Sequence, residues 1–278
     1  MSIVRPMDSR ESFGRRATRE ALSGPHHMPM WVQAGFWGLL AGAALIFGAA
    51  LGYLVKVPPR WIAGVTAFGS GVLISALAFE LMEDAFRRGG FAATAIGFLS
   101  GAIAFTAITL ILNRRGAKRR KRSKGQPSEA ESSGSGLVIA VGALLDGIPE
   151  SMVIGVSLLE GGSVSLVAVI AIFLSNLPEG MSSVVGMKRA GRSATYIFGV
   201  WIGIAVISGI AAAVGNVVFD GGSPQVIAGT TTVAAGAILA MLVDTMIPEA
   251  FEEAHDFAGL ITVAGFLVSF ALSKLFGG

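Results

Sequence analysis

Residues 135–159 read SGLVIAVGALLDGIPESMVIGVSLL, and the only ionisable side chains in this run are Asp146 and Glu150. The next run, residues 163–187, reads SVSLVAVIAIFLSNLPEGMSSVVGM, and its only ionisable side chain is Glu179. Each run is long enough for an α-helix to cross the roughly 30 Å hydrocarbon core of a bilayer. Two consecutive membrane helices with acids near their middles are therefore predicted.

The composition of the whole chain agrees with a membrane location. Hydrophobic residues make up 53% and charged residues only 14% of the sequence, and the mean hydropathy is +0.70. A soluble domain has roughly 25% charged residues, and it could not bury so much apolar surface. The absence of cysteine excludes disulfides and thiolate metal sites. The basic residues lie outside the apolar runs, so lipid head groups explain them better than a nucleic acid does, and we expect no nucleic-acid partner.

We predict an all-α membrane protein, an eight-transmembrane-helix bundle whose central fourth and fifth helices are kinked at Pro149 and Pro178. The predicted spans are residues 32–54, 61–86, 91–113, 135–159, 163–187, 193–219, 225–250 and 257–276. The predicted organisation is a polar tail expected to be disordered (1–31), three helices (32–113), a basic loop (114–134) and five helices (135–278).

The distribution of lysine and arginine predicts the orientation, because loops rich in these residues stay in the cytoplasm. Alternate loops on one face hold 13 bases, eight of them between Arg114 and Lys124. The opposite face has Arg87, Arg88 and Lys274, together with a tail whose arginines are mostly far from the first span. The 114–134 loop is therefore expected in the cytoplasm and both termini outside, in a multi-pass protein of the plasma (inner) membrane.

Within the predicted spans, lysine and arginine occur only at the span ends, so no base in the spans can neutralise the acids near their middles. A charge at the bilayer centre costs roughly 2.5 to 3.5 kcal/mol on insertion scales. The carboxyl groups are therefore protonated, or they line water, or a bound cation neutralises them. The alternative to a cation site is an interhelical hydrogen bond from a protonated acid to Ser, Thr or Asn.

Helical spacing favours the cation. Asp146 and Glu150 are four residues apart, as are Ser175 and Glu179, so each pair shares one helix face. Asn176 adds an amide carbonyl. The two segments, DGIPES (146–151) and SNLPEG (175–180), also resemble each other, and each proline frees the carbonyl four residues earlier, at Leu145 and Leu174.

Two further groups of acids lie near span ends. Glu80, Glu83 and Asp84 either pair with Arg87 and Arg88 or form a metal-attracting entrance. The second group is either a metal exit or a solvated loop, and its members are Asp244, Glu249, Glu252, Glu253 and His255.

With SNLPEG on the fifth helix and DGIPES on the fourth, the chain resembles the ZIP (Zrt-, Irt-like protein) family of metal transporters. The family has eight helices, outside termini and HNxPEG-type metal signatures on these two helices. The resemblance covers roughly residues 32–276 and implies a metal site made of Asp146, Glu150, Ser175, Asn176 and Glu179. The chain departs from the family where Asp146 and Ser175 replace the usual histidines.

Oxygen ligands favour manganese or ferrous iron relative to zinc, although carboxylates bind zinc as well. The expected function is import of a divalent ion (Zn, Mn or Fe) as cargo, without a resident cofactor. The alternative is a transport-inactive ZIP-like sensor or scaffold. No HExxH motif is present, and we expect no enzyme activity. The expected partners are the metal cation and the lipid bilayer, and a homodimer stays open.

Overall fold

The computed structural model describes residues 28–114, 135–161 and 164–276, and these residues form long helices without a β-strand. The predicted tail (1–31) and basic loop (114–134) thus lie almost entirely outside the described residues. The helices are α2 (Met30–Leu54), α3 (Pro59–Ala76), α4 (Glu83–Arg114), α5 (Ser135–Gly161), α6 (Leu166–Arg189), α7 (Ala194–Phe219), α8 (Pro224–Met241), α9 (Ile247–Ala254) and α10 (Ala258–Phe276).

Six helical stretches of the described chain are long and apolar enough to cross a membrane, judged by length and composition. The all-helical character predicted from the sequence is confirmed, and the six stretches are consistent with a multi-pass membrane protein, whereas this count does not confirm eight separate spans. Two of the six, Pro59–Ile111 and Pro224–Leu275, have 53 and 52 residues. At 1.5 Å per residue each would be roughly 80 Å long if straight, far more than a bilayer requires.

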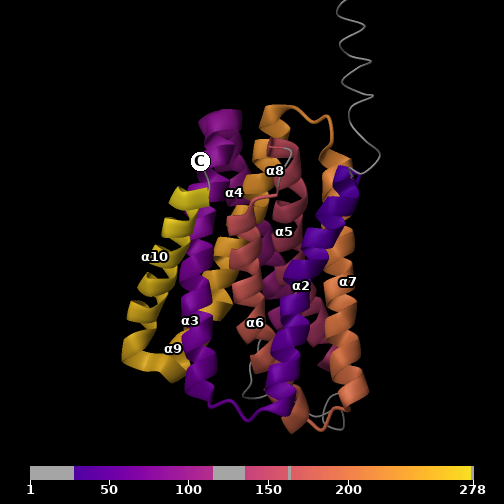
Figure 1. Cartoon of the computed structure of the whole chain (residues 1–278), viewed down its shortest axis with the longest axis vertical. Coiled ribbons are helices and arrows are strands. Elements are labelled where there is room, and N and C mark those ends of the chain that lie inside the picture. The colour runs from indigo at the N-terminus through magenta and orange to yellow at the C-terminus, as the bar shows by residue number, and fades with distance from the viewer. Residues whose placement is uncertain (1–27, 115–134, 162–163, 277–278) are drawn as a thin grey trace, which may run out of the picture.

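Both long stretches contain a break in the helical backbone. Gly90 inside α4 has φ 74° and ψ 175°, a conformation that glycine adopts readily because it lacks a Cβ atom. His255, which follows α9, has φ 43° and ψ −119°. The chain changes direction after α9 before α10 begins (Figure 1).

Each long stretch also contains a π-helical segment with one acid. Leu77–Met82 joins α3 to α4 and contains Glu80, and Leu242–Met246 joins α8 to α9 and contains Asp244. Single turns of π-helix inside α-helices occur frequently at functional sites. By contrast, α5 and α6 are continuous helices with Pro149 and Pro178 inside them, and the predicted kinks there stay predictions.

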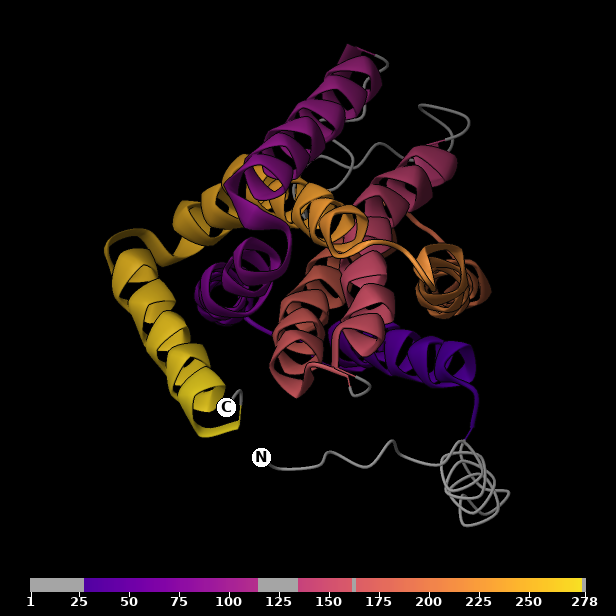
Figure 2. The same cartoon turned by 90° about the horizontal axis from the view of Figure 1, so that it is seen from above.

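In the bundle α5 and α6 lie near the middle, with α10 and α7 at opposite sides in both views (Figures 1 and 2). The helix contacts follow one scheme twice. In the first set, α2 and α3 pack on α6, and α3 also packs on α10. In the second set, α7 and α8 pack on α5, and α8 also packs on α4. The two sets meet where α2 contacts α7. The central pair thus receives equivalent support from two sets of flanking helices.

Glycines allow several of these helices to approach closely, as small residues do between membrane helices. A Cβ atom added to Gly180 of α6 would lie 2.3 Å from the carbonyl oxygen of Leu45 in α2. A Cβ atom added to Gly48 of α2 would lie 2.1 Å from the carbonyl oxygen of Leu177. The LPEG segment of α6 is therefore held directly against the backbone of α2.

The contact between α3 and α10 gives a test of this packing. A Cβ atom at Gly71 would lie 1.8 Å from the carbonyl oxygen of Thr262, so Gly71→Ala is expected to destabilise the protein by about 1–3 kcal/mol, as overpacking does. The measurement is the thermal unfolding midpoint in detergent. The matched control is Gly199→Ala on α7, where nothing lies within 4 Å of the added atom. Equal midpoints for the two variants would contradict the close α3–α10 packing.

Candidate metal site

The centre of the site is a carboxylate–hydroxyl pair between α5 and α6. The Ser175 Oγ atom lies 3.5 Å from the Glu150 Oε1 atom, and both residues are 2% exposed. The Ser175 hydroxyl also donates to the carbonyl oxygen of Ile172 at 2.9 Å. A hydroxyl has one proton and two acceptor lone pairs. If the shorter contact takes that proton, a lone pair of Ser175 is left facing the Glu150 carboxylate.

Asp146 on α5 and Asn176 on α6 are near this pair in the sequence, and both are buried. Asp146 lies one helical turn before Glu150, and its side chain is 5% exposed. Asn176 donates from Nδ2 to the carbonyl oxygen of Ala41 in α2 at 3.2 Å. This bond orients the side-chain amide against α2, and the role of Asn176 as a metal ligand stays a prediction.

Glu179 is half-buried on α6, one turn after Ser175. In the described residues no group of three or more His, Asp or Glu side chains is placed to hold one metal ion. Asp146, Glu150 and Glu179 therefore do not form a close three-carboxylate cluster in this arrangement, and their convergence on one cation stays a prediction. The structure instead brings together one carboxylate and one hydroxyl.

A second pair joins α9 to α6. The Ser182 hydroxyl donates to the Oε1 atom of Glu249. Glu249 was predicted from the sequence as part of a metal exit, but its partner was not. Ser182 is seven residues after Ser175 and three after Glu179, so the helical spacing that grouped those two residues would have included it.

A third contact involves Glu80 in the π-helical segment before α4. Its Oε1 atom accepts a hydrogen bond from Ser273 of α10 at 2.6 Å, and its Oε2 atom accepts one from Ser165 at 3.2 Å. Ser165 is also the N-cap of α6, where its hydroxyl oxygen accepts from the backbone N–H of Ala168. No sequence pattern linked Glu80 to these serines.

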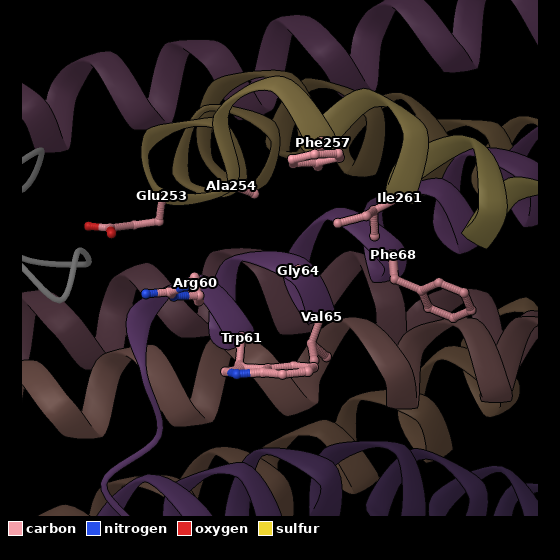
Figure 3. A pocket seen from close by; sticks show the side chains of 9 residues that line it. All are labelled: Arg60, Trp61, Gly64, Val65, Phe68, Glu253, Ala254, Phe257 and Ile261. Atoms are coloured by element: carbon pink, nitrogen blue, oxygen red, sulfur yellow. The ribbon is translucent and has the colours of Figure 1, made fainter.

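The other predicted entrance and exit residues lie outside these contacts. Glu83 forms an ion pair with Arg87, as expected if this acid is not part of a metal entrance. Asp84 is half-buried. Asp244, Glu252 and His255 are exposed, and the ring of His255 meets that of Phe251 edge to face. Glu253 is half-buried beside a groove at the start of α3 (Figure 3).

Three of the four serines in these contacts follow one another along α6 and its N-cap. With a rise of 1.5 Å per residue, Ser165 and Ser175 are about 15 Å apart along the axis, and Ser175 and Ser182 about 10 Å apart. The contacts with Glu80, Glu150 and Glu249 thus extend over most of a hydrocarbon core that is roughly 30 Å thick.

Comparison with known proteins gives a distant similarity. No family model matches the chain. A protein of Arabidopsis thaliana with the name "Putative zinc transporter" is 25% identical over 260 residues, which cover 91% of this chain. The chain spans 40% of the length of that relative. The similarity thus extends over nearly the whole described bundle.

Proposed function

We propose that this protein is a ZIP-like transporter that carries a divalent metal cation into the cytoplasm. The all-helical, apolar bundle and the distant similarity to a protein named as a zinc transporter support this function. The proposed ligands are Asp146, Glu150, Ser175, Asn176 and Glu179 from α5 and α6, and the proposed cargo is Zn²⁺, Mn²⁺ or Fe²⁺.

The observation that carries the proposal is the buried contact between Glu150 and Ser175. Zinc–oxygen bonds are about 2.0–2.2 Å long, so two oxygen ligands of one tetrahedral zinc are roughly 3.3–3.6 Å apart. The 3.5 Å between Ser175 Oγ and Glu150 Oε1 falls in this range. A cation between them would also supply positive charge to a carboxylate that is deeply buried.

We further propose that the metal moves along α6. Glu80 with Ser165 marks one end of the path, Glu150 with Ser175 its centre, and Ser182 with Glu249 the other end. A transported ion exchanges water for oxygen ligands at each step, and hydroxyl and carboxylate oxygens suit hard divalent ions. The path needs no histidine, in agreement with the absence of histidine from the spans.

We propose that the chain crosses the membrane eight times. Pro59–Ile111 and Pro224–Leu275 each supply two passes, because each is far longer than one pass and contains a backbone break, at Gly90 and at His255. The packing of α10 on α3 and of α4 on α8 supports this division.

The proposed orientation places both termini outside and the 114–134 loop in the cytoplasm, because the loops on that face hold 13 bases. The protein has no cysteine, so single cysteines introduced at Ser128 and Gly278 can be labelled without background. A membrane-impermeant maleimide should label Gly278→Cys in intact cells, and Ser128→Cys only after the membrane is opened. Labelling of both variants from one side would contradict the topology.

Metal flux into liposomes tests the function itself. The purified protein is reconstituted into vesicles that contain a metal-sensitive dye, and Zn²⁺, Mn²⁺ and Fe²⁺ are added outside in turn. Flux of at least one ion above that of protein-free vesicles is expected. Metal binding without flux of any ion would instead favour the transport-inactive sensor or scaffold.

A further inference from the structure

A groove between α3 and the α9–α10 turn lies apart from the proposed metal path. Its volume is about 680 Å³, within the range of sites for small ligands. Its walls are mostly apolar, and the lining residues are Arg60, Trp61, Gly64, Val65, Phe68, Glu253, Ala254, Phe257 and Ile261 (Figure 3).

The groove forms because α3 and α10 diverge toward the start of α3. At Gly71 and Gly265 the two helices are so close that an added Cβ atom would overlap backbone of the other helix. At Gly64, two turns earlier, only the Ile261 Cδ1 atom lies within 4 Å of such a Cβ atom, at 3.9 Å. The missing side chain of Gly64 leaves the space between the helices open.

The residues at the mouth of the groove are of the types that commonly lie at a membrane interface. Arg60 and Trp61 belong to the first turn of a membrane-length helix, where arginine and tryptophan commonly anchor the interface. Trp61 and Phe257 are each 67% exposed. In the described part of the chain Arg60 has no hydrogen-bond or ion-pair partner.

The charges at the mouth have opposite signs and come from opposite walls. Arg60 on α3 and Glu253 on α9 direct their charged ends to the same end of the groove, and Phe68 lies at the other end (Figure 3). A guanidinium binds phosphate through paired hydrogen bonds. A carboxylate accepts hydrogen bonds from a primary ammonium group.

We propose that this groove binds a phospholipid with a phosphoethanolamine head group. Arg60 holds the phosphate, Glu253 accepts from the primary ammonium, and an acyl chain lies along Val65, Phe68 and Ile261. The quaternary ammonium of a choline lipid has no N–H to donate, and a glycerol head group carries no cation. The structure thus assigns a preference for the ethanolamine lipid over both.

Quenching of tryptophan fluorescence by brominated acyl chains tests the assignment, since Trp61 lines the groove. The full-length protein is reconstituted in phosphatidylcholine vesicles containing equal mole fractions of brominated ethanolamine, choline or glycerol phospholipid. The ethanolamine lipid is expected to associate about two- to fivefold more strongly, the range that one exposed ion pair provides. In Trp61→Phe the excess quenching should disappear.

Four variants separate the groove from the surrounding lipid. Gly64→Leu and Ile261→Phe fill the groove from opposite walls, and either one should remove the excess quenching by the ethanolamine lipid. Gly199→Leu is the matched control on α7, where an added side chain meets open space, and it should retain the excess. Glu253→Gln should reduce the association of the ethanolamine lipid to that of the choline lipid.

Three results would overturn the proposal. Equal quenching by the three lipids would exclude a head-group preference, and strongest quenching by the glycerol lipid would exclude the role of Glu253. Cross-linking of Phe257→Cys between two protein molecules, with loss of Trp61 quenching by the lipid, would show that a second copy of the chain fills the groove. The experiment does not depend on metal flux, so its failure is distinct from failure of the proposed transport.

Discussion

Replacing Glu150 with glutamine is expected to reduce divalent-metal flux about 100-fold in the liposome assay. Glutamine preserves the shape of the side chain, so the change removes a charge and little else. A charge at the bilayer centre without its counter-charge costs roughly 2.5–3.5 kcal/mol, which corresponds to about two powers of ten in an equilibrium constant. Glu150 is 2% exposed, so water cannot readily replace the lost carboxylate oxygen.

A companion variant, Glu179→Ala, is expected to abolish the flux of every ion, because the span of α6 contains no other acid. The matched control is Asp220→Asn, which neutralises an exposed carboxylate at the end of α7 and should transport normally. Wild-type flux through correctly inserted Glu150→Gln or Glu179→Ala protein would show that the metal path lies elsewhere.

The second large effect concerns selectivity. The double variant Asp146→His, Ser175→His restores imidazole where the resemblance implies histidines. Imidazole nitrogen is a better donor for zinc than for manganese, so the ratio of zinc to manganese flux is expected to rise roughly tenfold, or about 1.4 kcal/mol. The ratio is measured by competition between the two ions in one vesicle preparation.

Two controls limit the interpretation of that ratio. Asp220→His adds an imidazole outside the site and should leave the ratio unchanged. Each single variant should give a smaller shift than the double variant, because Ser175 lies next to Glu150 and Asp146 lies one turn away. An unchanged ratio in a double variant that still transports would exclude Asp146 and Ser175 as ligands.

The two residues of the central contact could be identified as candidates from the sequence, because the spacing that groups each with its neighbour is local, whereas the contact between them is tertiary. Glu150 and Ser175 each belong to a pair with a four-residue spacing, in segments that resemble each other, and the structure brings these two residues together. Asp146, which shares a helix face with Glu150, is buried as well. The three-carboxylate cluster was not found among the described residues, because spacing places side chains on a face but does not set how far apart two helices stand.

The ends of the proposed path could not be predicted in the same way. Ser182 and Glu249 are 67 residues apart in the chain, and Ser273 and Glu80 are 193 apart. Such contacts depend on which helices are neighbours. Sequence reasoning also grouped Glu249 with Glu252 and His255, whereas the structure turns Glu249 to α6 and leaves the other two exposed.

By itself the sequence determined that this is a multi-pass helical membrane protein with carboxyl groups inside its spans, because hydropathy and helical period are local properties of the chain. Only the tertiary structure decided which serines meet those carboxyl groups and where α3 and α10 diverge. The physical reason is that lipid is as apolar as the helix surfaces, so hydropathy does not select helix partners. Close contacts at small residues such as Gly71 and Gly180 select them instead, and these depend on the fit of two surfaces.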